Sequence, residues 1–143
     1  YVRTSSPDIE SIGDLISEVQ PKIVVVDTID GINVRYTNDA FYKMEKIVLK
    51  LKDIAQQRKV IMLGISHISK GATYDQLNVH SAKGNSAIEQ KADKILGITG
   101  DRDKGTRRSV KGLASRDETN FNLQFKFDFD TFRFIQTKGE GHW

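Results

Sequence analysis

The stretch Ile23-Val24-Val25-Val26-Asp27 decides the expected fold. Its four aliphatic residues are all β-branched and favour an extended strand. A run without polar alternation is typical of a strand that is buried on both faces, as in a parallel sheet covered by helices. We therefore expect this stretch to be a strand of an α/β sheet, with Asp27 at its carboxyl end.

Helical periodicity flanks this strand on both sides. Ser6-Pro7 predicts a helix start with Ser6 as N-cap, and apolar residues follow at helical spacing as far as Val19. A second helix is expected after Thr37 or Asn38. Its predicted apolar stripe is Phe41, Met44, Val48, Leu51 and Ala55, with Ile47 and Ile54 beside it. Val60–Ile65 then predicts a second buried strand, so that strand, helix and strand form a right-handed βαβ unit.

The second half of the sequence changes character. Residues 71–85 lack hydrophobic periodicity and predict a loop, followed by a short helix over Ser86–Ala92 with Ser86 and Glu89 as a capping box. Lys94–Thr99 and Ser109–Ser115 predict two more strands. Aromatic and polar residues then alternate, which predicts a half-buried antiparallel strand; the apolar positions are Phe121, Leu123, Phe125, Phe127 and Phe129. A turn at Asp128–Thr131 leads back through Phe132 and Phe134.

These patterns together predict the fold class and the domain organisation. The class is α/β, with a mostly parallel sheet flanked by helices and extended by a C-terminal antiparallel hairpin. We expect one domain over residues 1–136 and a tail over residues 137–143.

Composition excludes several kinds of site. The 143 residues contain no cysteine, so disulfides and thiolate metal sites are excluded, and the spacing of His67, His80 and His142 fits no zinc motif. No apolar run approaches the roughly 20 residues that span a bilayer, and no signal peptide is visible. The net charge of +3 permits a nucleic-acid partner without requiring one. The first residue is Tyr1 and not Met, from which we expect the chain to be a fragment of a longer protein.

Two polar residues follow the predicted strands at the edge where α/β sheets bind ligands. Asp27 ends the first strand, and in a P-loop ATPase an acid at this position holds the Mg²⁺ ion that neutralises phosphate charge. His67 follows the second strand, where an imidazole can contact a terminal phosphate and report its loss to the next loop. The alternatives are that Asp27, like Asp30, only begins a loop, and that His67 is structural.

Two basic features extend this hypothesis. Lys70, Lys83, Gly84 and Ser86 offer charge, hydrogen-bond donors and a pliant backbone, which suit a sequence-independent grip on the phosphates of single-stranded DNA. Arg116 follows the strand Ser109–Ser115, and an arginine there can reach a nucleotide in a neighbouring subunit. The alternatives are a solvated basic loop and an ordinary surface arginine.

The sequence resembles the DnaB-type hexameric helicases in three segments: Ile23–Asp27, Gly64–Lys70 and Ser81–Asp93. The third is the most specific, because a loop ending in a small residue, then Ile88-Glu89-Gln90 and Ala92-Asp93, is a hallmark of that group. The mitochondrial helicase Twinkle and phage primase-helicases look similar. The resemblance covers nearly the whole chain, to about Ile135.

The resemblance implies the C-terminal half of a RecA-like P-loop NTPase core that uses ATP and Mg²⁺. It also implies a hexameric ring that moves along single-stranded DNA in the cytoplasm or nucleoid, with no membrane partner. Carried over by position, Asp27 is the magnesium-associated Walker B acid and His67 replaces the usual glutamine sensor. Lys70, Lys83, Gly84 and Ser86 belong to the DNA-binding loop region, and Arg116 is the arginine finger acting in trans.

Departures from the family pattern keep alternatives open. Ala114 stands where the family usually has lysine, and Asp117-Glu118 replaces a common Asn-Gly. His67-Ile68-Ser69-Lys70 also resembles RadA- and KaiC-like ATPases. The sequence contains no Gly-x-x-x-x-Gly-Lys-Ser/Thr, the motif whose backbone cradles phosphates. We therefore expect this chain alone to hydrolyse no ATP, and a non-catalytic RecA-like binding or assembly module is the alternative.

Overall fold

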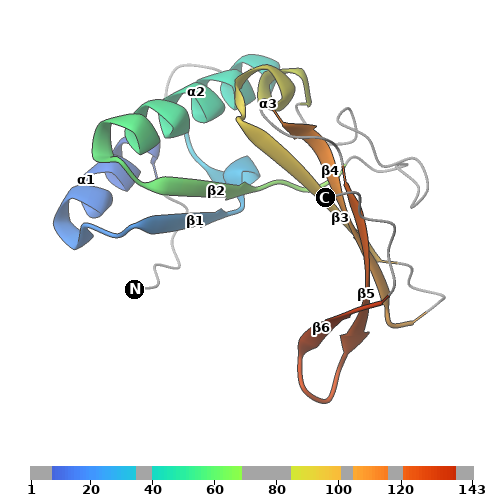
Figure 1. Cartoon of the computed structure of the whole chain (residues 1–143). Helices are drawn as coiled ribbons and strands as arrows, with labels where there is room; N and C mark the ends of the chain where they lie inside the picture. Colours follow the sequence, from blue (N-terminus) through green and yellow to red (C-terminus); the bar gives the residue numbers. More distant parts are fainter. Residues whose placement is uncertain (1–7, 35–39, 69–84, 101–104, 116–120, 138–143) are drawn as a thin grey trace. The chain divides into compact units, whose positions relative to one another are not determined.

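The computed structural model describes residues 8–34, 40–68, 85–100, 105–115 and 121–137, and the chain divides into two units (Figure 1). The first unit contains the described residues up to Ile68 together with residues 85–92. Its elements are α1 (Ile9–Val19), β1 (Ile23–Asp27), the 3-10 turn η1 (Ile29–Gly31), α2 (Ala40–Arg58), β2 (Ile61–Ile65) and α3 (Asn85–Lys91). The expectation of a single domain over residues 1–136 stays a prediction.

β1 and β2 form a parallel pair with α2 as the connection between them, which confirms the expected strand, helix and strand order. The register runs from Ile23 opposite Ile61 to Asp27 opposite Ile65. Both strands therefore end at the same edge. This edge is where the sequence places its two candidate site residues.

The core of the first unit lies between the helices and one face of this strand pair (Figure 1). α1 and α2 supply most of it through the buried residues Ile9, Ile12, Ile16, Met44, Ile47, Leu51 and Ile54. On α2 the stripe is centred on the fully buried Ile47, whereas Val48 is only half-buried, so the predicted stripe was rotated by about one position. α3 packs against α2 through Ala87 and Ile88, and the Lys52 ammonium donates a hydrogen bond of 2.9 Å to the Lys91 carbonyl. Among the described helices, none is long and apolar enough to cross a membrane.

Helix starts differ from the sequence predictions by one or two residues. α1 begins at Ile9 with Asp8 in the N-cap position, so the predicted cap at Ser6 is wrong, and Ser6 itself lies outside the described residues. α3 begins at Asn85, which puts the backbone of Ser86 inside the helix and not at its cap. The capping candidates of the second helix, Thr37 and Asn38, also lie outside the described residues.

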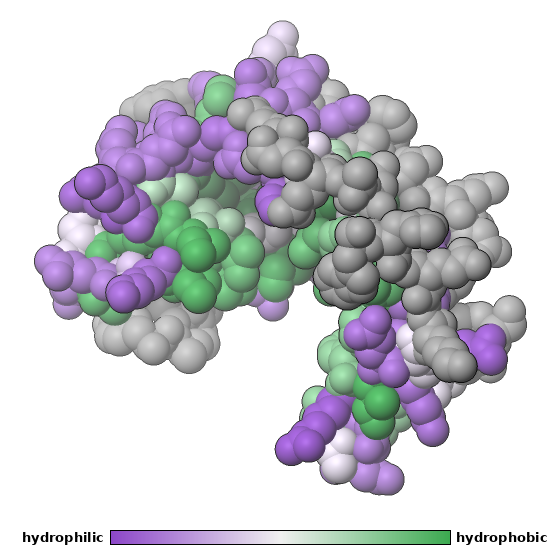
Figure 2. All heavy atoms as spheres, in the orientation of Figure 1, coloured by the Kyte–Doolittle hydropathy of each residue, from purple (hydrophilic) through white to green (hydrophobic). Residues whose placement is uncertain are grey.

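The prediction that β1 and β2 are buried on both faces is wrong. Alternate residues of the pair expose between 45% and 60% of their surface: Ile23, Val25, Ile61, Leu63 and Ile65. We call these five side chains the outer face of the strand pair. Hydrophobic atoms open to solvent are visible in Figure 2. A run of β-branched residues specifies an extended backbone, but a second covering layer depends on which other chain segments pack there.

The second unit is an antiparallel sheet in the order β3 (Lys94–Gly100), β4 (Arg107–Ser115), β5 (Asn122–Asp128) and β6 (Arg133–Gln136). The mostly parallel sheet is therefore a wrong expectation for the described strands, because parallel pairing is confined to β1 and β2. The connection from Gly100 to Arg107 explains the difference, since a parallel crossover needs about a dozen residues or more.

The predicted C-terminal hairpin is confirmed as β5 and β6. Phe127 packs edge-on against Phe129 and Phe134, with ring centroids 4.8 and 5.0 Å apart. At the turn, the Asp128 carboxylate accepts hydrogen bonds from the Thr131 hydroxyl at 2.7 Å and from the Asp130 N–H at 2.9 Å. These bonds, the hydroxyl bond first, lower the pKa of Asp128 below its ordinary 3.8.

Candidate functional site

Asp27 and His67 lie at the same edge of the first unit. Asp27 is the last residue of β1, opposite Ile65, and its side chain is exposed. His67 follows β2 by two residues, and 75% of its side chain is exposed. The structure thus brings these two sequence-predicted residues to the same sheet edge.

Asp30 is a third polar residue at this edge, which the sequence left as an ordinary loop residue. Its Oδ2 accepts the backbone N–H of His67 at 3.2 Å and lies 3.5 Å from the Nδ1 atom of the same residue. Its Oδ1 accepts a hydrogen bond from the Ser66 hydroxyl at 3.4 Å. Only 17% of the Asp30 side chain is exposed, so its carboxylate is much better shielded than the imidazole that it contacts.

The position of Asp30 follows from the packing of η1. Ile29 and Ile32 are buried on either side of Asp30, and the Ile32 N–H bonds to the Ile29 carbonyl at 3.2 Å. Gly64 of β2 faces this turn, where an added Cβ would lie 3.0 Å from the Ile29 Cγ2 atom. The glycine therefore permits the close approach of η1 to β2 that brings Asp30 to His67. The interruption of an aliphatic strand by Gly64 was the sequence signal for this contact.

The donor set at this edge suits a hard cation. Asp27 and Asp30 carry carboxylates and Ser66 carries a hydroxyl, and Mg²⁺ prefers such oxygen ligands. Within the described residues no three histidine, aspartate or glutamate side chains gather as a complete metal cage. That fits a magnesium ion held by one or two carboxylates together with water and the phosphates of a nucleotide.

The other predicted site residues receive little or no structural test. Lys70, Lys83, Gly84 and Arg116 lie outside the described residues. Ser86 is described only in its backbone, within the first turn of α3. Their roles stay predictions.

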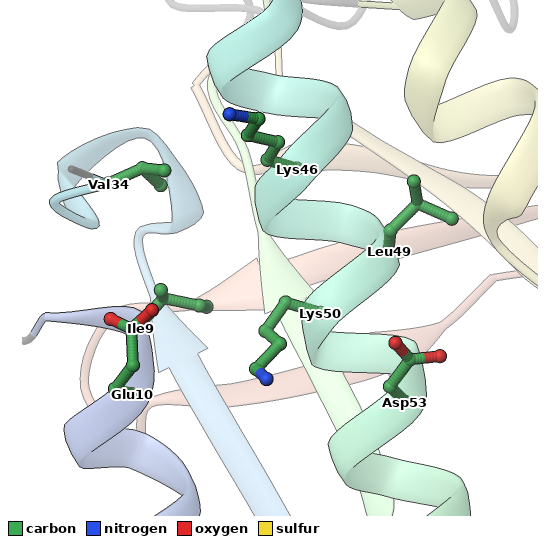
Figure 3. A pocket seen from close by; sticks show the side chains of 7 residues that line it. All are labelled: Ile9, Glu10, Val34, Lys46, Leu49, Lys50 and Asp53. Carbon is green, nitrogen blue, oxygen red and sulfur yellow. The ribbon is translucent and has the colours of Figure 1, made fainter. Parts of the chain in front are cut away.

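A hollow of about 480 Å³ lies between α1 and α2, away from the residues discussed so far (Figure 3). Its lining combines both signs of charge with aliphatic side chains: Ile9, Glu10, Val34, Lys46, Leu49, Lys50 and Asp53. Two carboxylates balance two ammonium groups, so the hollow has no net charge to attract an anion. None of the predicted site residues lines it, and we place the candidate site at the ends of β1 and β2 on chemical grounds.

Comparison with known proteins reveals similarity in structure. No family model matches the sequence, and no curated protein matches it. The chain superposes on a separately solved ATPase domain of a DnaB-like helicase with a TM-score of 0.82 at 19% identity, covering 92% of this chain and 52% of that one. A second DnaB-like replicative helicase, solved for its interactions with primase, gives a TM-score of 0.84 at 17% identity, covering 95% and 36% of the two chains.

A KaiC-like protein from the hyperthermophilic archaeon Pyrococcus horikoshii is also similar. Its TM-score is 0.61 at 15% identity, with 91% of this chain and 55% of that chain covered. The chain thus spans between about one third and one half of the proteins that it matches. It has the fold of part of a DnaB-like helicase ATPase domain, as its sequence resemblance implied.

Proposed function

From this shared fold, we propose that the chain is the C-terminal part of a RecA-like ATPase domain in a DnaB-like helicase. In this proposal the complete protein couples ATP hydrolysis to movement along single-stranded DNA as a hexameric ring. Another part of that protein supplies the phosphate-binding loop that this sequence lacks. The chain alone is inactive for that reason.

The observation that carries the proposal is the shared edge of Asp27 and His67. Asp27 ends a strand whose parallel neighbour leads directly into His67, so an acid and an imidazole flank the same ligand position. Ligands of open α/β sheets bind outside the carboxyl ends of the strands. A nucleotide with its phosphates at this edge is therefore within reach of both side chains.

Each residue has a stated task in the proposed mechanism. Magnesium, when bound, would neutralise charge on the phosphates, and Asp27 holds it. His67 donates a hydrogen bond to the terminal phosphate and loses that partner when the phosphate leaves. Lys70, Lys83, Gly84 and Ser86 hold the DNA backbone, and Arg116 stabilises transition-state charge in the neighbouring subunit. Loss of the His67 contact is then transmitted along the segment that carries the DNA-binding residues.

The test is Asp27→Ala in the complete protein that contains this chain and its phosphate-binding loop. We expect magnesium-dependent ATP hydrolysis to fall on the order of a hundredfold or more, because transition-state charge loses its stabilisation. Nucleotide binding measured without magnesium should change little. The matched control is Asp14→Ala, which removes an exposed carboxylate from α1. Unchanged turnover in Asp27→Ala would refute the assignment.

A KaiC- or RadA-like ATPase is the second candidate, favoured by the structural similarity to the KaiC-like protein. Its TM-score of 0.61 is lower than the 0.82 and 0.84 of the helicase domains, so we rank it second. The two differ in their response to DNA. ATP hydrolysis that single-stranded DNA stimulates, together with strand separation, supports the helicase. Hydrolysis without either response supports the second candidate, and absence of any hydrolysis supports the non-catalytic module.

A further inference from the structure

We propose that Asp30 is a positioning residue for His67, which it holds in one ring orientation and one tautomer. The inference rests on the proposed function, in which His67 meets the terminal phosphate of the nucleotide. It adds a carboxylate behind the imidazole to the acid in front of the ligand. Asp27 and Asp30 thus take different tasks, although they lie only three residues apart.

One oxygen of Asp30 addresses both the backbone and the ring of the same residue. Oδ2 accepts the His67 N–H at 3.2 Å and lies 3.5 Å from Nδ1. Fixing the main chain and the ring from one point restricts the side-chain torsions of His67, which an exposed imidazole would otherwise sample freely. The Ser66 hydroxyl on Oδ1 holds the carboxylate in turn.

The support for this carboxylate is itself firm. η1 is closed by bonds from Gly31 N–H to the Thr28 carbonyl and from Ile32 N–H to the Ile29 carbonyl. Ile29 and Ile32 anchor the turn in the core. Asp30 therefore projects from a fixed backbone, whereas the imidazole that it contacts is largely open to solvent.

An acceptor at Nδ1 has a chemical consequence for the other ring nitrogen. The neutral ring places its proton on Nδ1, toward Asp30, so Nε2 becomes the nitrogen available to a ligand. When the ring takes up a second proton, Nε2–H becomes a donor suited to a phosphate oxygen, and the carboxylate behind it balances the charge. Such a carboxylate orients the imidazole without touching the substrate.

The first experiment reads the ring directly in the 143-residue chain by nitrogen-15 NMR of its histidines, with His67→Gln to assign the signal. At a pH where the ring is neutral, we expect wild-type Nδ1 to appear protonated. In Asp30→Ala the proton should move largely to Nε2. Ser66→Ala and the charge-matched Asp14→Ala should leave the ring signal as in wild type.

A second variant separates positioning of the ring from a purely structural role. Asp30→Asn keeps an oxygen for the backbone N–H of His67 but removes the charge behind the ring. We expect it to retain the far-UV circular dichroism of wild type, with a tautomer ratio between those of wild type and Asp30→Ala. The same Nδ1 signal in wild type and Asp30→Ala would overturn the inference.

Hydrolysis by the complete protein then distinguishes this inference from the proposed function. Asp30→Ala should lower kcat by about a hundredfold, the cost of a misplaced catalytic contact, with the KM for ATP unchanged. If Asp27→Ala abolishes hydrolysis and Asp30→Ala leaves kcat intact, the role of Asp30 is refuted and the proposed function stands. If Asp27→Ala has no effect, the proposed function fails, and the ring signal alone decides the role of Asp30.

Discussion

Adding one methyl group at Gly64 should weaken the hold of Asp30 on His67 from the opposite side of the contact. In Gly64→Ala the new Cβ would lie 3.0 Å from Ile29 Cγ2. Carbon atoms pack at about 3.5–4.0 Å, so the turn and the strand must separate by about 0.5 Å. Because Asp30 is in the same turn as Ile29, its carboxylate moves with it.

The displacement is large compared with the tolerance of the hydrogen bond. The distance from Asp30 Oδ2 to the His67 nitrogen is 3.2 Å. An increase of about 0.5 Å takes it to about 3.7 Å, beyond the range of a useful hydrogen bond. Overpacking of the buried Ile29 costs about 1–3 kcal/mol, and replacing a strand glycine by alanine recovers about 0.5–1 kcal/mol. We expect the free energy of unfolding to fall by about 1 kcal/mol.

The matched control is Gly31→Ala in the same turn, where an added Cβ meets no atom within 4 Å. Urea unfolding followed by far-UV circular dichroism reports the first unit, because all the described helices belong to it. The histidine NMR signal reports the contact itself. A Gly64→Ala chain that is as stable as wild type and keeps the wild-type His67 signal would show that the close approach of η1 to β2 does not govern the site.

Two further predictions concern the hairpin and the DNA-binding loop. Thr131→Ala removes the hydroxyl bond that most lowers the pKa of Asp128, so this pKa should rise toward 3.8 in an NMR titration. Since the pKa of Asp128 is lower in the folded chain, its stabilising effect is present above pH 3.8 and is lost as the pH falls through the folded pKa; an unshifted titration in the variant would contradict this cause. Lys83→Ala in the complete protein should weaken binding to single-stranded DNA and reduce the slope of log affinity against log salt by about 1. An unaltered slope in fluorescence-anisotropy titrations would remove Lys83 from the DNA contact.

The sequence predicted most of the local structure because that structure depends on local patterns. The β-branched run at Ile23 and the alternating aromatic residues around Phe125 both lie in strands, and the resemblance to DnaB-type helicases agrees with the observed fold. The roles of Lys70, Lys83 and Arg116 were assigned by resemblance alone and stay predictions.

What the sequence analysis missed depends on contacts between distant segments. The approach of Ile29 to Gly64 spans 35 positions (64 − 29) and fixes Asp30, and no local pattern encodes it. The antiparallel pairing of β3 with β4 was open to prediction, since the connection after Gly100 is too short for a parallel crossover. Exposure of Val25 was not, because it depends on which residues cover the sheet.

The outer face of β1 and β2 has an electrostatic consequence at its end. Side chains alternate along a strand, so Asp27 projects on the same side as Ile23 and Val25. Any polypeptide that dries this aliphatic surface will also draw water away from the Asp27 carboxylate. Drying the carboxylate strengthens its attraction for a cation, because Coulomb interactions grow as the local dielectric constant falls. Hydrophobic association and cation affinity are thereby linked along a single strand.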